Sequence, residues 1–557
     1  MIALIRSTPV ALALALLVGT GAGQLNGTYT IDPSGSGSRN FKTFNAAVTA
    51  LAAGVNGPVT FTIASVVFQE TVLIATPISG ASATNTISFV APSGQAVLDA
   101  NGQNDALRIV SPVSWLRFEN IKIINWRRRG LVIASGAGLP RDFVFSRIEI
   151  DNEAPGSPFD PPAAFDATDV IDCVVRNCIL RGTSGAAVVN YGSNVLFDSC
   201  EMDGLGKARP VLYLVNGRDS DHVVKNCFIH SPGNTRSYGY ALRLAANSLG
   251  AMIVNNTIIS DHSEATVFLT SPPDPWSQAS SFKNNIVINL GTGPAIVFEW
   301  ISNQISPYVS DHNCYYSRNP SNRILVSTWW NPLIVFSGDL AAFRAWQKQN
   351  PAAIVPGGVT SYDANSIEAD PGLVSMTQPF DIHLKQTSPV IDLGTTNLVE
   401  PFQTFPQGFK VTHDFEGQVR EWKPDIGADE IAASLVGSGS TSIGGTQNLA
   451  LAAPRDAGLL CQVGSSFGTG PIMIGWRPLG LGLDDLLLAT ANNYWPRVFS
   501  GYRGVLDGQG QAKAGINIPY APTLIGLRLN TAFVTISPSA PFGIQSISNT
   551  VSFTITT

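Results

Sequence analysis

The chain has 557 residues, of which only 13% are charged, and its formal net charge is -6 at pH 7. It contains 52 glycines and 36 prolines, a composition that suits many turns and little exposed helix. The negative charge argues against nucleic acid as a partner, because phosphate binding requires a basic surface.

The first 23 residues are predicted to be an export signal. Arg6 precedes an apolar run from Val10 to Val18, and small residues follow this run near Ala22 and Gly23. The run is too short to span a bilayer, and no later stretch is long and apolar enough to form a transmembrane segment. We therefore expect a secreted or extracellular protein, with association at the cell surface left open.

Residues 24–433 are predicted to form the main domain, which begins with an amphipathic helix. Because the first coil of a stacked β-structure is an open edge, such a helix would cover it and prevent end-to-end pairing. The apolar face of this helix is formed by Phe41, Phe44, Ala47, Val48 and Leu51.

A short phrase recurs between about residues 116 and 316 and predicts the architecture of the main domain. Its central position returns at intervals of 22 to 30 residues, a range typical of solenoid coils. Apolar and polar residues alternate around this position, as in strands with one buried face. An Asn usually precedes it, and because Asn tolerates a left-handed backbone we interpret it as a corner between two strands. The aligned residues are Ile121, Ile148, Cys178, Cys200, Cys227, Asn256, Asn285 and Cys314.

This repeat favours a parallel β-helix over two other repeat folds. A leucine-rich repeat would need helical segments within an L-x-x-L-x-L frame, and a β-propeller would need Trp-Asp signatures at about 40 residues. Neither pattern occurs here. In a β-helix, neighbouring coils bury one another's faces, which no single coil can do.

The cysteines are interpreted as interior residues rather than as a disulfide framework. Cys178, Cys200 and Cys227 occupy the aligned position on successive coils, roughly 4.8 Å apart along the stack. We expect no zinc site, since neither paired C-x-x-C spacing nor a nearby His pair appears. A calcium ion at Asp219 and Asp221 stays open as an option, although few other oxygen ligands stand near them.

Both ends of the main domain resemble a known family. The stretches NFKTFNAAVTAL and GPVTFTI, together with DFEGQVREWKPDIGADEI, are similar to segments of secreted bacterial right-handed parallel β-helix proteins of the pectate-lyase-like superfamily. The resemblance spans about residues 27–431. It implies the fold without implying one activity, because the group includes lyases, hydrolases, epimerases and adhesins.

The end of the chain is predicted to hold a closing motif, a linker and a second all-β domain. The closing motif should place three carboxylates around the guanidinium of Arg420 and lock the last coil. Residues 434–446 read as a Gly/Ser-rich linker, and strand-like runs in residues 447–557 predict a small β-sandwich. The three carboxylates are those of Asp414, Asp425 and Glu430.

The candidate site is an outward stack on the third strand of successive coils. Tyr213, Arg243 and Phe268 should lie side by side, so that a sugar acid could bind the guanidinium while it stacks on the rings. A self-satisfied surface stack is the alternative. A polysaccharide lyase would also need a base and a cation for the substrate carboxylate. The candidates for these catalytic roles are Lys207, Arg236, Tyr240 and Arg243.

Hydrolysis by a carboxylate pair is not expected. Such a pair requires carboxyl groups about 5 to 9.5 Å apart. The outward-facing Asp166 and Glu299 are five coils apart, or about 24 Å. We expect a structural or glycan-binding protein whose partner is an acidic polysaccharide or a cell-surface glycan, with no organic cofactor. A polysaccharide lyase or epimerase acting along the β-helix groove is the alternative.

Overall fold

The computed structural model describes residues 23–110, 112–136, 138–151, 163–183, 185–207, 210–215, 221–233, 239–245, 250–270, 280–301, 304–305, 308–319, 323–328, 334–350, 362–399 and 408–557. Residues 1–22 of the predicted export signal lie outside these ranges. Within them, no helix has the length and apolar character needed to cross a membrane.

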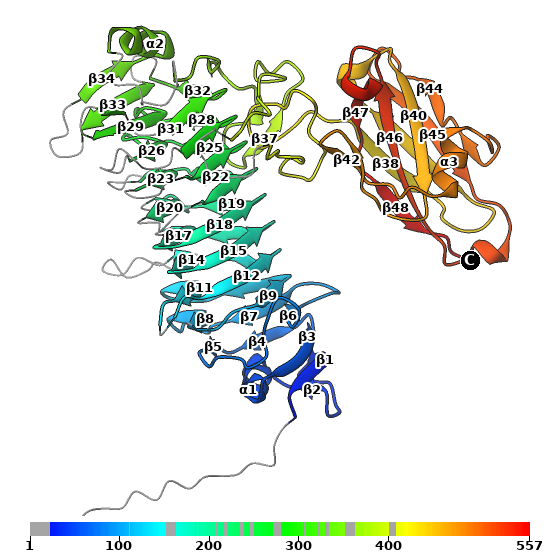
Figure 1. Ribbon diagram of the computed structural model, residues 1–557, viewed down its shortest axis with the longest axis horizontal. Coiled ribbons are helices and arrows are strands. Elements are labelled where there is room, and N and C mark those ends of the chain that lie inside the picture. Colours follow the sequence, from blue (N-terminus) through cyan, green and yellow to red (C-terminus); the bar gives the residue numbers. More distant parts are fainter. Residues whose placement is uncertain are drawn as a thin grey trace, which may run out of the picture.

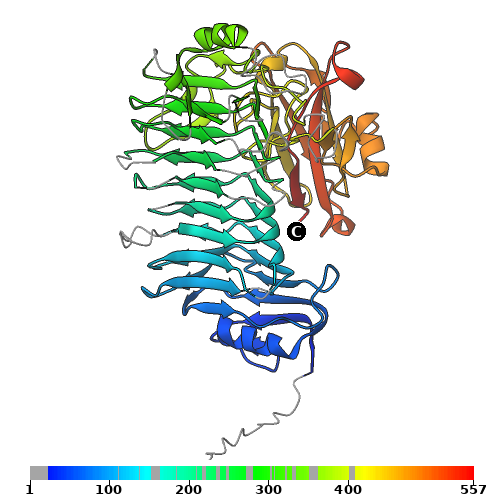
Figure 2. The same ribbon diagram turned by 60° about the vertical axis from the view of Figure 1, so that its left-hand side comes forward.

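The main domain is a right-handed parallel β-helix, as predicted, and its coils stack along one axis (Figures 1 and 2). Three sheets run the length of the stack. Sheet A consists of β1 (Leu25–Ile31), β2 (Asn40–Phe41), β3 (Val55–Ile63), β6 (Ile87–Val90), β9 (Leu116–Glu119), β12 (Arg141–Ser146), β15 (Ile171–Arg176), β18 (Ser193–Asp198), β21 (Val223–Lys225), β24 (Met252–Val254), β27 (Ser280–Lys283) and β31 (Tyr308–Asp311). Sheet B consists of β4 (Val67–Gln69), β7 (Ala96–Asp99), β10 (Ile121–Ile124), β13 (Glu149–Ile150), β16 (Ile179–Arg181), β19 (Glu201–Asp203), β22 (Phe228–Ser231), β25 (Thr257–Ser260), β28 (Ile286–Asn289), β32 (Cys314–Ser317) and β35 (Ile367–Glu368). Sheet C consists of β5 (Val72–Ile74), β8 (Asp105–Val110), β11 (Arg129–Ala134), β14 (Ala163–Thr168), β17 (Ala187–Asn190), β20 (Leu212–Val215), β23 (Leu242–Leu244), β26 (Val267–Leu269), β29 (Ile296–Ile301), β33 (Ile324–Thr328) and β34 (Ile334–Gly338), with β30 (Gln304–Ile305) beside β29.

The Asn corner lies between sheets A and B, where the backbone is left-handed as predicted. Its φ angle is 61° at Asn120, 53° at Asn226 and 58° at Asn284. Because this conformation is strained for most side chains, Asn is favoured at the corner. The corner turns the chain sharply enough for the next residue to point inward.

The inward position after the corner carries first thiols and then amides. Cys178, Cys200 and Cys227 are buried and free, which confirms the interior ladder. On the following coils, Asn285 accepts a hydrogen bond from the backbone N–H of Asn256 at 3.1 Å. Amide ladders of this kind satisfy buried polar groups from coil to coil.

The predicted alignment is wrong by one residue at its last member. Cys314 pairs with Ile286, so that Asn313 occupies the aligned position beside Asn285. His312 takes the left-handed corner with a φ angle of 54°. The coil carries Ser310, rather than an apolar residue, at the inward position opposite Phe282, which obscured its register.

Short helices cover both ends of the stack. The predicted N-terminal helix is α1 (Phe44–Ala50), capped by Thr43 and extended by a 3-10 turn, η1 (Leu51–Ala53). Phe41, predicted to lie on its apolar face, belongs to β2 instead. At the other end, α2 (Leu340–Gln349) stacks Phe343 on Phe298, with ring centroids 5.8 Å apart. Both helices bury an apolar face against the terminal coils.

A non-repeating segment follows α2 and leads back along the coils. It contains a hairpin of β36 (Leu373–Ser375) and β37 (Asp381–Leu384). Residues 395–399 and 408–430, here called the strap, then lie along the Asn corner. Thr395 exchanges hydrogen bonds with the side chain of Asn284 at 2.8 and 2.9 Å.

The closing motif lies in the strap, but it differs from the predicted lock in two ways. Arg420 forms one carboxylate pair, with Glu430 at 2.9 Å, and donates to Asn226 at 3.0 Å. It therefore anchors the strap to a coil in the middle of the stack rather than to the last coil. Asp414 and Asp425 instead accept backbone N–H groups, since three charged carboxylates buried around one guanidinium would leave excess charge. Burial raises the pKa of Asp414 to about 7 and that of Asp425 to about 6.

The C-terminal domain is a β-sandwich with two antiparallel sheets, as predicted (Figure 1). Residues 434–439 differ from the predicted linker, because they form the first strand of one sheet. The first sheet contains β38 (Ser434–Gly439), β39 (Thr446–Ala452), β45 (Gln511–Asn517) and β43 (Phe499–Ser500). The second contains β44 (Arg503–Val505), β40 (Leu460–Ser466), β46 (Arg528–Ile536), β47 (Ile544–Ile547) and β48 (Val551–Thr554). The remaining elements are β41 (Ile472–Ile474), β42 (Arg477–Leu479), α3 (Asp485–Ala491), η3 (Pro454–Asp456), η4 (Pro522–Leu524) and η5 (Pro541–Gly543).

A cation–π contact joins the strap to this second domain. Trp422 donates its ring N–H to the carbonyl of Ile544 at 2.8 Å. The guanidinium of Arg477 lies 4.0 Å from the ring centroid of Trp422. The indole is therefore held by the second domain on its polar edge and on one face.

Candidate functional site

The predicted outward stack is present on sheet C. Tyr213 pairs with Arg243 and Arg243 pairs with Phe268 on the adjacent strands β20, β23 and β26. The guanidinium carbon of Arg243 lies 5.4 Å from the ring centroid of each neighbour. In-register parallel pairing thus places one cation between two aromatic rings, all three partly exposed on the outer face.

Tyr240 completes the surroundings of the guanidinium. It stands just before β23, and its ring centroid lies 5.9 Å from the guanidinium carbon of Arg243. The Tyr240 and Phe268 rings are tilted against each other with centroids 4.8 Å apart. Tyr240 is only 6% exposed, so it serves as a wall of the site rather than as a free hydroxyl at its surface.

Arg243 has no acceptor for its N–H groups within the described part of the chain. Its Nε atom is buried without a hydrogen-bond partner, and no described carboxylate forms an ion pair with it. A guanidinium carries five N–H donors, and leaving buried donors unpaired costs about 1–3 kcal/mol or more. Among the described residues, the guanidinium is therefore surrounded by aromatic rings and has no carboxylate paired with it.

Glu299 is a buried carboxyl in the neighbourhood of this cation. It lies on β29, is 7% exposed, and its Oε2 atom has no hydrogen-bond partner. Burial raises the pKa of Glu299, while a hydrogen bond from Thr270 and the charge of Arg243 oppose that rise. The charge of Arg243 thus affects the pKa of Glu299, although the two groups do not form an ion pair.

The other predicted residues are not gathered around Arg243. Lys207 is exposed in the turn after β19, where its backbone N–H bonds to Gly204, and no contact joins it to the stack. Arg236 and Asp219 lie outside the described residues. Asp166 forms an ion pair with Arg129 at 3.2 Å. The expected separation from Glu299 is confirmed, since β14 and β29 are five strand positions apart in sheet C.

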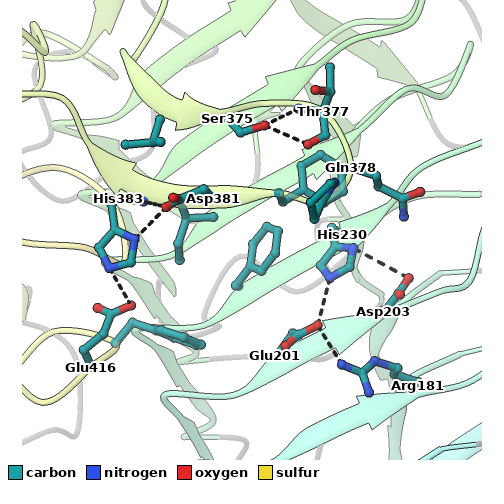
Figure 3. Close-up of a pocket in the computed structure, with 16 residues that line it drawn as sticks. Arg181, Glu201, Asp203, His230, Ser375, Thr377, Gln378, Asp381, His383 and Glu416 are labelled. Atoms are coloured by element: carbon teal, nitrogen blue, oxygen red, sulfur yellow. Dashed lines mark hydrogen bonds and ion pairs between the residues drawn. The ribbon is translucent and has the colours of Figure 1, made fainter.

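A second site, on sheet B, was not predicted. A cleft of about 1010 Å³ separates the outer face of this sheet from the β36–β37 hairpin (Figure 3). Phe228 forms part of its floor, and Phe380 packs edge-on against that ring at 5.7 Å. The hairpin thus covers a sheet face that would otherwise be open to solvent.

Charged groups in this cleft pair with one another. Arg181 lies 3.7 Å from Glu149, 3.5 Å from Asp151 and 3.3 Å from Glu201. His230 stands between the Glu201 and Asp203 carboxylates, with nitrogen-to-oxygen distances of 3.5 and 3.6 Å (Figure 3). The interaction with His230 and the charge of Arg181 hold the pKa of Glu201 below its usual range, although burial opposes them.

A sequence signal for this cleft exists on the second strand of each coil. The inward Leu180, Met202 and Ile229 alternate with outward residues of which most are charged or titratable, in the triplets ILR, EMD and FIH. The predicted site instead involved outward residues of the third strand, Tyr213, Arg243 and Phe268. The covering hairpin has no counterpart in the repeat, so nothing local indicates where it packs.

Comparison with known proteins supports the fold. The family described as "Right handed beta helix region" matches residues 163–331. No curated protein sequence matches the chain. Together with the strand order, the match identifies a right-handed parallel β-helix protein.

Solved structures with a similar fold have low sequence identity. Pectate lyase Pel9A is 13% identical with a TM-score of 0.39, over 74% of this chain and 97% of the lyase. The A-module of the mannuronan C-5 epimerase AlgE4 of Azotobacter vinelandii is 12% identical with a TM-score of 0.35, over 52% of this chain and 87% of the module. Tailspike protein 2 of the Escherichia coli O157:H7 bacteriophage CAB120 is 10% identical with a TM-score of 0.32, over 97% of this chain and 69% of the tailspike. At these sequence identities and TM-scores, the similarity concerns the fold alone.

Proposed function

We propose that the protein is secreted or displayed at the cell surface and binds an acidic glycan on the outer face of sheet C. The observation that carries this proposal is the unpaired guanidinium of Arg243 between the rings of Tyr213 and Phe268. A planar guanidinium binds a carboxylate through two parallel hydrogen bonds. The flanking rings offer apolar surface to the faces of the sugar.

The single cation of the sheet C stack favours a carboxylated glycan over a polyphosphate. The net charge is -6, and Arg243 presents a single cation rather than a basic patch. Polyphosphates are bound through many lysines and arginines, whereas one bidentate guanidinium suits one sugar carboxylate. Pectate and mannuronan, which the names of two similar structures contain, are suitable probes.

The test compares two arginines in the same outward row of sheet C. Arg108 on β8 lies five strand positions from Arg243, about 24 Å, and is already paired with Asp105 at 3.0 Å. We expect Arg243→Met to weaken binding of oligogalacturonate or oligomannuronate about 10- to 100-fold, because charge-assisted hydrogen bonds are lost. Isothermal titration calorimetry measures the affinity, with a neutral oligosaccharide as the ligand control.

The matched variant Arg108→Met should bind like the wild type. Equal affinity of the wild type and Arg243→Met would refute the proposed glycan site. Equal weakening in both arginine variants would indicate nonspecific charge attraction. Loss of ligand binding in Arg243→Met alone is the expected result.

A polysaccharide lyase or epimerase is the second candidate, favoured by the buried Glu299 carboxyl near Arg243. A base beside a cation that neutralises the substrate carboxylate is what abstraction of the neighbouring proton requires. Absorbance from unsaturated products reports lyase activity, and proton exchange with deuterated water reports epimerisation. Turnover that disappears in Glu299→Gln, while affinity stays within about threefold, would establish the enzyme.

A further inference from the structure

Three distant segments bring metal-ligating side chains together at one end of the sheet B cleft. His383 comes from β37, Glu416 from a turn of the strap and Asp429 from its end. One ligand atom of each lies within 4.8 Å of the others. His383 and Glu416 also line the cleft (Figure 3).

The imidazole of His383 is oriented as it would be for a metal. Its Nδ1 atom lies 2.6 Å from the Asp381 carboxylate, which fixes the ring. Its Nε2 atom faces Glu416 Oε1 at 3.6 Å. A carboxylate that accepts one ring N–H leaves the lone pair of the other nitrogen available, which is the usual arrangement of metal-bound histidines.

Asp429 supplies an independent indication of a missing ligand. The residue is 3% exposed, and its Oδ2 atom accepts the backbone N–H of Leu384 at 2.7 Å. Its Oδ1 atom is buried without a hydrogen-bond partner. An unpaired carboxylate oxygen in the interior is costly, and coordination of a cation would remove that cost.

We propose that His383, Glu416 and Asp429 bind one divalent transition-metal ion. One imidazole nitrogen and two carboxylate oxygens suit Zn²⁺, whereas Ca²⁺ and Mg²⁺ prefer oxygen ligands alone. Tetrahedral ligands about 2.1 Å from zinc are about 3.4 Å from one another. The 3.6 Å between His383 and Glu416 fits this spacing, and the third ligand has to approach by about an ångström.

The same arrangement explains why no metal was expected from the sequence. The ligands are 33 and 13 residues apart, and no short His or Cys spacing marks them.

The ion would connect the hairpin to the strap. The side chains of His383 and Glu416 are 53% and 30% exposed, so the fourth coordination position is open to water from the cleft.

The experiment is zinc binding by the full-length protein, purified without a histidine tag and stripped with a chelator. We expect one zinc per chain after gel filtration, measured by elemental analysis, and a rise in Tm on adding zinc. All six cysteines are free but buried, so they should not compete for the ion. Substitution of Co²⁺ should give visible d–d absorption.

Variants of the partly exposed ligands decide the proposal. His383→Gln and Glu416→Gln should each lower the affinity for zinc at least tenfold. Asp381→Asn should lower it about 10- to 100-fold, because the imidazole ring loses the carboxylate that orients it. Glu119→Gln is the matched control, because this glutamate is 36% exposed and pairs with Arg147 elsewhere on the β-helix.

The competing interpretation is a protonated His383 that bridges Asp381 and Glu416 without a metal. No zinc retained by the wild type, or equal zinc in the wild type and in folded His383→Gln, would overturn the proposal. Circular dichroism of each variant establishes that it is folded.

Discussion

An arginine projects from the outer face of sheet B and another from that of sheet C, in opposite surroundings. Arg181 on sheet B has three carboxylates at 3.3 to 3.7 Å. Arg243 on sheet C has three aromatic rings at 5.4 to 5.9 Å and no described acceptor. The first cation has its counter-charges within the fold, whereas no carboxylate of the described residues forms an ion pair with the second. It is therefore the arginine of sheet C, rather than the more highly charged group on sheet B, that the proposed glycan site uses.

Removing each arginine should therefore affect a different property. Arg181→Met removes the cation shared by three partly buried carboxylates, and we expect it to lower the free energy of unfolding by about 1–3 kcal/mol. Lys122 still pairs with Glu149 at 2.6 Å, and His230 still lies 3.5 Å from Glu201. Arg243→Met removes a buried Nε that has no hydrogen-bond partner and breaks no ion pair of the described residues, so we expect it not to lower the free energy of unfolding. Urea unfolding followed by tryptophan fluorescence measures both values.

Glycan affinity should show the reverse pattern. Arg181→Met should bind acidic oligosaccharides as the wild type does. A large loss of stability in Arg243→Met, or a loss of binding in Arg181→Met, would remove the distinction between the two faces.

Two glutamates should respond to pH with opposite signs. The pKa of Glu201 is lowered, chiefly by His230, so its charged form stabilises the fold above the usual value of 4.5 and this contribution is lost as the pH falls. The pKa of Glu299 is raised by burial, so its protonated form stabilises the fold below 4.5 and this contribution is lost as the pH rises.

At pH 7 we therefore expect Glu201→Gln to be less stable than the wild type and Glu299→Gln to be more stable, each by about 1 kcal/mol. Thermal melts between pH 3 and pH 8 give the comparison. The difference in stability between Glu201→Gln and the wild type should disappear as the pH falls below 4.5, the usual pKa of a glutamate. The difference between Glu299→Gln and the wild type should grow as the pH rises above that value. Parallel trends in the two variants would contradict the assigned environments.

The smallest effect should come from the rings beside Arg243. Phe268→Leu and Tyr213→Leu keep apolar volume but remove the aromatic face, and we expect each to weaken glycan binding about threefold to tenfold. Phe228→Leu on sheet B is the matched control and should leave affinity unchanged. The measurement is the same calorimetric titration, and equal weakening by all three substitutions would show that the sheet C rings have no special role.

Local periodicity predicts most of the β-helix, because each coil repeats the same inward and outward choices. The stack of Tyr213, Arg243 and Phe268 could be predicted for this reason, since in-register pairing follows from the repeat. The position of Cys314 could not, because its coil departs from the apolar pattern.

Segments outside the repeat escape such prediction, because their partners are far away in the chain. Arg420 bonds to Asn226, 194 residues earlier, and no local pattern links the two. The cleft on sheet B depends on the hairpin in the same way. Residues 434–439 have the composition of a linker, yet antiparallel pairing with β39 places them in a sheet. For these segments tertiary contacts outweigh local preference.

The strap has a consequence for the order in which the protein folds. Coils can stack one after another as the chain emerges, because each pairs with a neighbour close in sequence. Two of the Asn corners, however, bond to residues that are synthesised much later: Asn284 bonds to Thr395, 111 residues on, and Asn226 to His413, 187 residues on. Closing loops of that length costs entropy, so docking of the strap should be the last and slowest step. Until then the nascent β-helix exposes these two corner amides, and a chain that stops before residue 395 would leave both without their partners in the strap.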